Sequence, residues 1–295
     1  KFLEHYYPDM LPHLSSCKSP QQMFGALLKS YYCQKYGIDP EKLFVVSVIP
    51  CTAKKYEVGR PEEKTYNDQD VDVALTTREL AKMIRGAGIK FADLQDEAFD
   101  APFDTGSGAG TIFGATGGVM EAALRTAACW LGVKLKTVEL KQVRGPEAIR
   151  DVTYDLGGKP VRVAVTSGLA NARKLLEKIK SGEADYQMVE VMACPGGCIN
   201  GGGQPVQSDS VRNYTDLKAL RSAALYQADQ KNALRLSGDN PRLQTLYEEF
   251  LDAPGKPRAH MLLHTTYVRR NAAGLPQPNP DVINGPLGES HPKKL

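Results

Sequence analysis

The amino-acid sequence predicts an α/β fold made of two pseudo-symmetric lobes of mostly parallel sheet flanked by helices, followed by a helical C-terminal part. Strand-like segments at residues 43–50 and 186–193 each lead to a cysteine, Cys51 and Cys194, and strand-like segments are repeatedly followed by helical ones. Because ligands in such folds bind beyond the carboxyl ends of the strands, we expect the active site in the crevice between the lobes.

The first lobe is predicted from two strand signals and one helix signal. Residues 43–50 are a continuous apolar, β-branched run, which predicts a strand buried on both faces. Residues 71–75 form a second strand-like run, and Thr76 or Thr77 can cap an amphipathic helix that closes near Gly86. This lobe therefore contains a strand followed by a helix.

The middle of the chain alternates between strand and helix signals and predicts the second lobe. We expect a glycine-rich segment at 106–118, a helix ending at Gly132, a strand at 133–143, a hairpin at 151–167 turning at Gly157 and Gly158, a helix at 169–179 and a strand at 186–193.

The last third of the chain is predicted to be mainly helical from Pro205 to Tyr267. Residues 268–295 are rich in proline and predict an extended or disordered tail. We therefore expect residues 1–267 to form one two-lobed domain.

Composition limits the classes of partner and compartment. The 37 basic and 34 acidic residues are spread along the chain, which does not indicate a nucleic-acid or anionic-membrane surface. No stretch approaches the roughly 20 apolar residues of a membrane span, and the first residues lack a signal-peptide layout. Six cysteines in 295 residues are too few for a disulfide scaffold and favour a reducing, cytoplasmic compartment.

The strongest chemical signal is at residues 191–205. Cys194 and Cys198 stand four apart across a Pro-Gly-Gly turn, and three more glycines follow. Such thiolates can bind two corners of an iron–sulfur cubane or one zinc ion, and glycines allow backbone N–H groups to approach cluster sulfides. The pair alone also fits two buried cysteines in a tight turn, but the density of glycine favours a metal site.

A third thiol follows the first predicted strand. Cys51 is followed by Lys54, Lys55 and Glu57. A cation beside a thiolate lowers the thiol pKa and can hydrogen-bond anionic ligands of a cluster. A lysine pair after a strand is usually only a solvated loop. The two cysteine motifs together favour a cluster site.

A structural zinc module is an alternative use of these cysteines. Such a site normally shows a second C-x2-C or histidine pair close by, and none is present near them. His260 and His264 are four apart on a predicted helix, and a polar helix face explains them more readily than metal ligation.

The motif residues resemble a known family. VMACPGGCINGGGQP (191–205) and IPCTAKKYE (49–57) closely resemble the third and second signature motifs of the FeFe, or iron-only, hydrogenases. LSSCKSPQQMFG (14–25), SGAGTIFGATGGVMEAALR (107–125) and LLHTTY near the predicted end of the domain are also similar to that family. The resemblance covers nearly all of residues 1–267 and identifies an H-cluster catalytic domain, the C-terminal region of the family's large chain.

The resemblance implies an H-cluster, a four-iron cubane joined through one cysteine to a two-iron subsite with CO, cyanide and dithiolate ligands. Cys51 and Cys194 would bind cubane iron, and Cys198 would bridge to the two-iron subsite. Lys54 would hydrogen-bond a cyanide, a charge-assisted contact, and Glu57 would pair with or position Lys54.

Further roles follow from the same motifs. Ser15 matches the serine of the family's proton path, which suits a hydroxyl because it both donates and accepts. Without the resemblance, Ser15 and Ser19 would be interpreted as helix caps or loop serines. Residues that match the lining or cofactor-binding positions of the subsite are Ser19, Pro20, Gln21, Phe113, Met192 and Gly202, of which Phe113 and Met192 would otherwise be ordinary core residues.

The sequence departs from the family pattern in two ways. The first cysteine motif, which supplies a cubane ligand and a proton-passing cysteine just before the position of Lys1, does not occur, so we expect a truncated sequence. With three of four cubane thiolates, the chain as given should bind a cluster poorly and be inactive. Ile49 replaces a methionine common in the family, which should alter packing beside the subsite.

These features predict reversible reduction of protons to hydrogen, with electrons from a ferredoxin or an upstream iron–sulfur domain. Hydrogenase maturation proteins would be further partners. The alternative is a hydrogenase-like iron–sulfur assembly or sensory protein that binds a cubane without hydrogenase activity.

Overall fold

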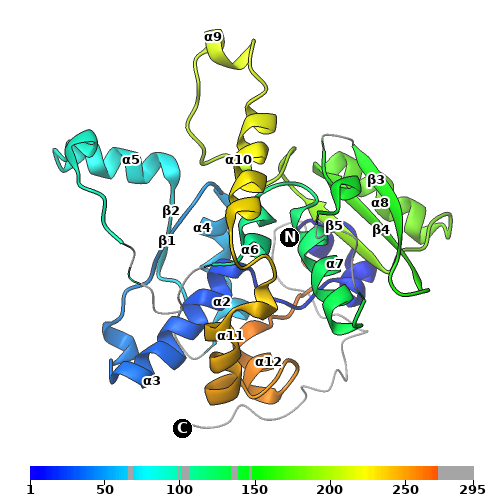
Figure 1. Cartoon of the computed structure of the whole chain (residues 1–295), viewed down its shortest axis with the longest axis horizontal. Helices are drawn as coiled ribbons and strands as arrows, with labels where there is room; N and C mark the ends of the chain where they lie inside the picture. The colour runs from blue at the N-terminus through cyan, green and yellow to red at the C-terminus, as the bar shows by residue number, and fades with distance from the viewer. Residues whose placement is uncertain (66–68, 99, 101–105, 134–138, 146–147, 272–295) are drawn as a thin grey trace.

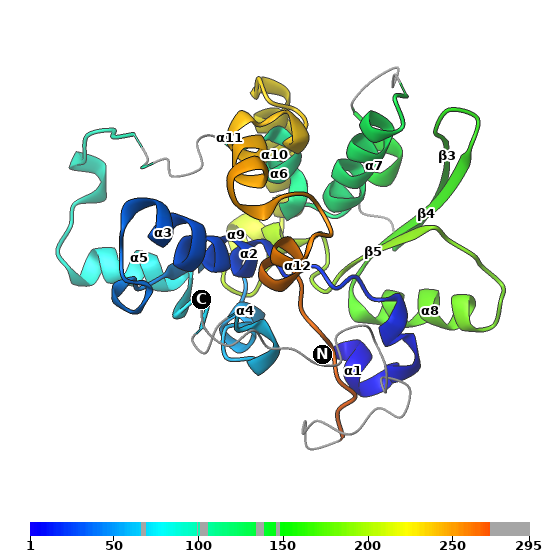
Figure 2. The same ribbon diagram turned by 90° about the horizontal axis from the view of Figure 1, so that it is seen from below.

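Two lobes flank a central group of helices in the computed structural model (Figure 1). It describes residues 1–65, 69–98, 100, 106–133, 139–145 and 148–271. The first lobe carries β1, β2 and α5, the second carries β3 to β5 with α7 and α8, and α6, α10 and α11 lie between them (Figure 2). This arrangement confirms the predicted α/β class with two lobes and a helical C-terminal part.

The first lobe contains a two-stranded parallel sheet. Strand β1 (Val46–Ile49) pairs with β2 (Val73–Thr76) and leads through Cys51 into the short helix α4 (Ala53–Glu57). Helix α5 (Thr77–Gly86) follows β2 directly. Thr76 and Glu79 form a capping box at its start, as the predicted N-cap requires.

The prediction that β1 is buried on both faces is wrong. Val46 and Val48 are 46% and 47% exposed, and the intervening residues are only half-buried. A continuous apolar run indicates a fully buried strand only if other layers cover both faces of the sheet. Within the described residues, this sheet has two strands and one apolar face is open.

The second lobe has a three-stranded sheet with its own core. Strands β3 (Ile149–Asp155) and β4 (Pro160–Ser167) form the predicted antiparallel hairpin, and β4 pairs in parallel with β5 (Met188–Met192). Helices α7 (Gly118–Trp130) and α8 (Leu169–Lys180) pack on the sheet. Met120 and Leu124 of α7 are buried against Val163 and Val165 of β4.

The strand predicted at 133–143 is not found in the part of that range that the structure describes. Residues 134–138 lie outside the described residues, but Lys141–Val143 forms a 3-10 turn rather than a strand. Val143 is fully buried beside α7, so its apolar character reflects core packing at a turn.

Helices between the lobes form a second apolar core. Helix α2 (Pro20–Leu27) continues through a π-helical turn, Leu28–Tyr32, into α3 (Cys33–Tyr36). Helix α11 (Pro241–Leu246), the following π-helical turn Tyr247–Leu251 and α12 (Pro257–Leu263) complete this core. Helices α6 (Gly108–Thr111), α9 (Asp209–Arg212) and α10 (Leu217–Lys231), all within the described residues, contribute no side chain to it. The buried side chains of this core are Ala26, Tyr31, Leu246, Phe250, Leu251, Ala259 and Leu262.

A buried ion network joins the second lobe to α10. Arg125 on α7 donates to both carboxylate oxygens of Asp229 at 3.0 and 2.8 Å, and to Glu121 at 2.7 Å. Arg144 and Arg235 donate to the same two carboxylates. Arg125, Glu121 and Asp229 are buried, so each charge depends on its partners.

The described chain continues four residues beyond Tyr267, to Asn271. Helix α1 (Phe2–Tyr6) carries the buried Glu4, whose carboxylate accepts hydrogen bonds from Arg60, Arg270 and the backbone of Val268. Val268 and Arg270 therefore belong to the packed structure, because they close this network. Residues 272–295 of the predicted tail lie outside the described residues.

Candidate iron–sulfur site

The two cysteine-bearing strand ends contact each other through their backbones. Cys51 follows Pro50 after β1, and Cys194 comes two residues after β5. The N–H of Gly203 donates to the carbonyl oxygen of Pro50 at 3.2 Å. A Cβ atom at Gly201 would overlap the same oxygen. The glycine run after the second motif therefore brings the two lobes' cysteine segments together.

The turn between the two cysteines of the second motif packs on the segment between α6 and α7. Gly196 and Gly197 have φ angles of 88° and 99°, which favour glycine. The N–H of Thr116 donates to the carbonyl of Gly196 at 3.2 Å, and a Cβ at Gly197 would come within 2.6 Å of the carbonyl oxygen of Gly114. Glycine is therefore required here for a close backbone contact.

The two cysteines of the second motif have ionisation behaviour that depends on their surroundings. Burial raises the pKa of the Cys194 and Cys198 thiols, and the neighbouring Cys51 raises both further. A hydrogen bond from the Gly202 backbone opposes the shift at Cys194, and the Lys54 charge opposes it at Cys198. All three are free cysteines and partly buried. Clustered thiolates with backbone N–H donors fit an iron–sulfur cluster, whose sulfurs accept such hydrogen bonds.

A hydrogen-bond network lies beside Cys51. The Lys54 ammonium donates to both carboxylate oxygens of Glu57, at 2.7 and 2.8 Å. Glu57 also accepts from the Ser19 hydroxyl at 2.7 Å and the Gln21 amide at 2.9 Å, and Gln21 accepts from Ser47 at 2.6 Å. Four predicted site residues therefore form one hydrogen-bonded group. Ser47 also belongs to it and was not predicted from the sequence motifs.

Other predicted residues lie on the same elements. Ser15 is exposed and precedes α2, and Pro20 is the first residue of α2. Phe113 lies in the 3-10 turn after α6, and Met192 ends β5; both are partly buried. Ser19 occupies the N-cap position of α2, but its hydroxyl makes no cap hydrogen bond and instead donates to the Glu57 carboxylate. The roles of these residues at a subsite stay predictions.

Three cations around the second cysteine loop were missed by sequence reasoning. Arg78 on α5 and Arg221 on α10 donate to loop carbonyls at 2.7 and 3.0 Å, and Lys218 lies over the glycine turn. Among the described residues none of these three forms an ion pair. No local pattern distinguishes them from ordinary charged residues of a helix surface.

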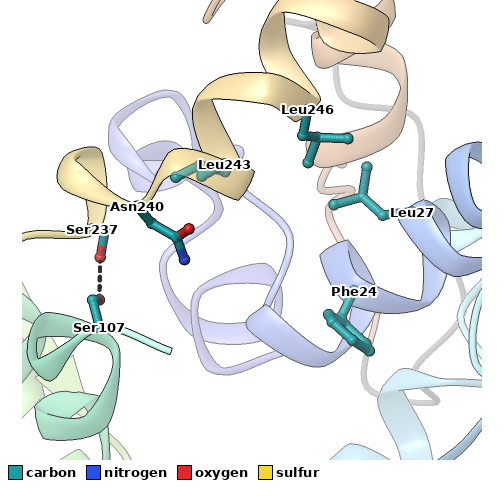
Figure 3. A pocket seen from close by; sticks show the side chains of 7 residues that line it. All are labelled: Phe24, Leu27, Ser107, Ser237, Asn240, Leu243 and Leu246. Carbon is teal, nitrogen blue, oxygen red and sulfur yellow. Dashed lines mark hydrogen bonds between the residues drawn. The ribbon is translucent and has the colours of Figure 1, made fainter. Parts of the chain in front are cut away.

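An apolar cavity of about 230 Å³ lies away from the cysteines (Figure 3). Ser107 and Ser237 form a hydrogen bond of 2.8 Å at one side of it. No predicted site residue lines the cavity, whose lining residues are Phe24, Leu27, Ser107, Ser237, Asn240, Leu243 and Leu246.

The described residues contain no group of three His, Cys, Asp or Glu side chains placed to hold a single metal ion. A cubane is a larger ligand that spreads its cysteines over separate irons. His260 and His264 stack with ring centroids 4.5 Å apart, and His264 hydrogen-bonds Ser16 at 2.8 Å. Only His260 lies on α12; His264 follows the end of the helix in extended conformation and forms a β-bridge with Cys17, so the prediction that both lie on one helix face is wrong for His264.

The two-lobed α/β fold, with cysteines at the strand ends of both lobes, defines the class of this chain as a hydrogenase-like domain. The chain belongs to the iron-only hydrogenase family. The family described as "Iron only hydrogenase large subunit, C-terminal domain" matches residues 1–202, and "Iron hydrogenase small subunit" matches residues 215–270. The family implies iron–sulfur cofactors.

Curated relatives include hydrogenases and assembly proteins. The chain is 49% identical to the NADP-reducing hydrogenase subunit HndD of Solidesulfovibrio fructosivorans, covering 92% of this chain and 46% of that protein. Iron hydrogenase 1 of Clostridium pasteurianum is 44% identical over 90% of this chain and 46% of its own length. Cytosolic iron-sulfur assembly component 3 of Bos taurus is 32% identical over 90% of this chain and 56% of its own length. The chain spans about half the length of these relatives.

Solved structures agree with the family. An FeFe-hydrogenase variant from Chlamydomonas reinhardtii matches with a TM-score of 0.76 at 40% identity, covering 91% of this chain and 73% of that one. An apo variant of the same enzyme matches equally well. Over the described part of the chain, none of the helices has the length and apolar character needed to cross a bilayer.

Proposed function

We propose that this chain is the larger part of an iron hydrogenase catalytic domain that reduces protons reversibly to hydrogen at an H-cluster. The observation that carries the proposal is the junction of the two lobes, where Cys51 and the loop of Cys194 and Cys198 meet through Pro50 and Gly203. Iron–sulfur assembly relatives are less similar, at 31–34% identity against 44–49% for the hydrogenases.

Each thiol has an assigned role in this proposal. Cys51 and Cys194 would hold cubane iron, and Cys198 would be the thiolate shared with the two-iron subsite. When bound, the H-cluster supplies the redox chemistry that joins protons and electrons. The Gly202 N–H donates toward Cys194 and stabilises its thiolate. The raised pKa values of Cys194 and Cys198 mean that cluster binding releases protons and should strengthen as pH rises.

The hydrogen bonds of Glu57 orient the Lys54 ammonium. Glu57 holds the Lys54 ammonium with two hydrogen bonds, while Ser19 and Gln21 both donate to its Oε2 oxygen. Lys54 is thereby positioned to donate to an anionic diatomic ligand. Ser15 is the proposed proton-relay hydroxyl, and Pro20, Phe113 and Met192 exclude water from the subsite.

An electron donor with an acidic surface fits the cations around the loop. Arg78, Lys218 and Arg221 place positive charge directly over the cysteine turn. We propose that a ferredoxin or ferredoxin-like domain docks here. Lys218→Glu should lower the rate of reduction by an acidic ferredoxin several-fold at low salt. A rate unaffected by both this substitution and added salt would exclude docking at the loop.

Infrared spectroscopy of the holoprotein that contains this chain, produced with hydrogenase maturation proteins, tests the activity. We expect CO and cyanide bands, and their loss together with most of the iron in Cys198→Ala. The matched control is Cys129→Ala, because this cysteine is exposed and lies at the far end of α7 from the cysteine turn. Cubane iron without CO and cyanide bands would favour an assembly or sensory function, and zinc without iron a structural module.

The compartment stays a prediction. We propose a cytoplasmic protein from its cysteine content, although one relative is named a periplasmic hydrogenase large subunit. Cell fractionation with an antibody to the chain would test this.

A further inference from the structure

Glu190 is a buried carboxylate that the proposed chemistry does not use. It lies in the middle of β5, two residues before Met192 and four before Cys194, and is 6% exposed. Among the described residues, no lysine or arginine forms an ion pair with it. Burial raises the pKa of Glu190, so keeping this group in the core without a cation requires specific donors.

Those donors are the first N–H groups of α7. One carboxylate oxygen accepts from the Gly117 N–H and the other from the Met120 N–H, both at 2.7 Å. The helix has 13 residues, so its free N–H groups and dipole favour a negative charge at this end. No residue of the helix's own N-terminal segment supplies a side-chain cap. Glu190 therefore caps α7 from another element of the lobe.

The residues just before α7 contact the turn between Cys194 and Cys198. Thr116 donates its N–H to Gly196, and Gly197 packs on the Gly114 carbonyl. A Cβ at Gly117 would overlap the carbonyl oxygen of Val143, so this segment cannot move without breaking other packing. The position of the cysteine turn is therefore linked to the position of the first residues of α7.

We propose that Glu190 is a positioning residue for the cluster site: by holding the N-terminus of α7 on β5, it fixes residues 113–117 against the turn between Cys194 and Cys198. The strand that delivers Cys194 thus also controls the surface on which the turn between the two cysteines rests. This inference deepens the proposed function and rests on it only for the identity of the cluster.

The test compares three variants with the wild type, each as the full-length protein without metal. Glu190→Gln keeps the side-chain shape but has one good acceptor for two N–H donors. Glu190→Asp keeps the charge but is too short to reach both. Glu4→Gln is the matched control, because Glu4 is equally buried and its network contains none of the residues around the cysteine turn.

The first readout is the alkylation rate of each cysteine, followed by mass spectrometry. In Glu190→Gln the Cys198 rate should rise about tenfold relative to Cys51, and peptides covering residues 114–120 should lose hydrogen-exchange protection. Glu190→Asp should show a smaller change in the same direction. The control should leave the Cys198 to Cys51 ratio within about twofold of wild type, even though it destabilises the fold.

The proposal is overturned if a folded Glu190 variant keeps both the wild-type ratio and the wild-type protection of residues 114–120. If Glu190→Gln does not fold, Glu190→Asp decides by the same criteria. A second readout is the electron paramagnetic resonance spectrum of the reconstituted cubane, whose g values should shift in the Glu190 variants and not in Glu4→Gln. Failure of the wild type to hold a cubane would instead count against the proposed function, because the alkylation result is obtained without a cluster.

Discussion

The two lobes deliver cysteines in the same way but are stabilised differently. In the second lobe, β4 is covered on both faces, and Val163 and Val165 are 0% and 1% exposed. In the first lobe, Val46 and Val48 of β1 are about half exposed. Both lobes still have a strand that ends near a cysteine. A strand end can therefore be placed by its own core, as in the second lobe, or mainly by contacts with other segments, as in the first.

Removing Asp229 should have the largest effect, because the second lobe depends on a buried ion network. Asp229→Ala leaves Arg125 buried with one partner fewer and should reduce the free energy of unfolding by about 3–5 kcal/mol. The comparison in the first lobe is a surface pair, Lys55 and Glu79 at 2.8 Å, whose side chains are 40% and 42% exposed. Lys55→Ala should cost less than about 1 kcal/mol. Urea unfolding of both variants measures the difference, and equal losses would contradict it.

Acid should next weaken the contact between α1 and the first lobe. Burial alone would raise the pKa of Glu4, but hydrogen bonds from Arg60 and the Val268 backbone lower it to about 2, below its ordinary 4.5. This stabilisation is complete above about pH 4.5 and is lost as pH falls toward 2, at most about 3 kcal/mol.

Thermal unfolding between about pH 5 and 2 measures this dependence. Glu4→Gln should be less stable at neutral pH and show a shallower loss of stability on acidification. Parallel pH curves for the variant and the wild type would show that Glu4 does not contribute.

A pair of identical truncations should give the smallest effect. Val165→Ala removes two methyl groups from a closed core and should cost about 2 kcal/mol. Val48→Ala, on the open face of β1, should cost less than about 0.5 kcal/mol. Comparing their unfolding midpoints tests whether the first lobe's sheet is open in solution. A cost at Val48 as large as that at Val165 would mean that this face is covered in the folded protein.

Sequence reasoning succeeded where the signal is local. The N-cap expected at Thr76 or Thr77, the end of α7 before Gly132 and the hairpin at Gly157 depend on neighbouring residues, and the structure confirms all three, with Thr76 as the N-cap. The two cysteine segments were also found from local motifs, because glycine and cysteine spacing is visible in the sequence.

Features that depend on distant contacts could not be predicted. The open face of β1 depends on what covers the sheet, and the sequence of a strand does not contain that information. Arg270 lies just beyond the predicted end of the domain, but its partners Glu4 and Glu62 are more than 200 residues away. Glu190 looks like a polar residue in an alternating strand until α7 is placed next to it.

The contact between Pro50 and the glycines at 201 and 203 has a consequence for variation among related chains. Because it consists of peptide groups, the spacing between the two cysteine segments is set by a backbone hydrogen bond and close backbone packing rather than by the size of any side chain. Side chains around it, such as Ile49, can change without altering that spacing. Chains that keep these glycines can therefore diversify the pocket walls while retaining one fixed separation of their thiols.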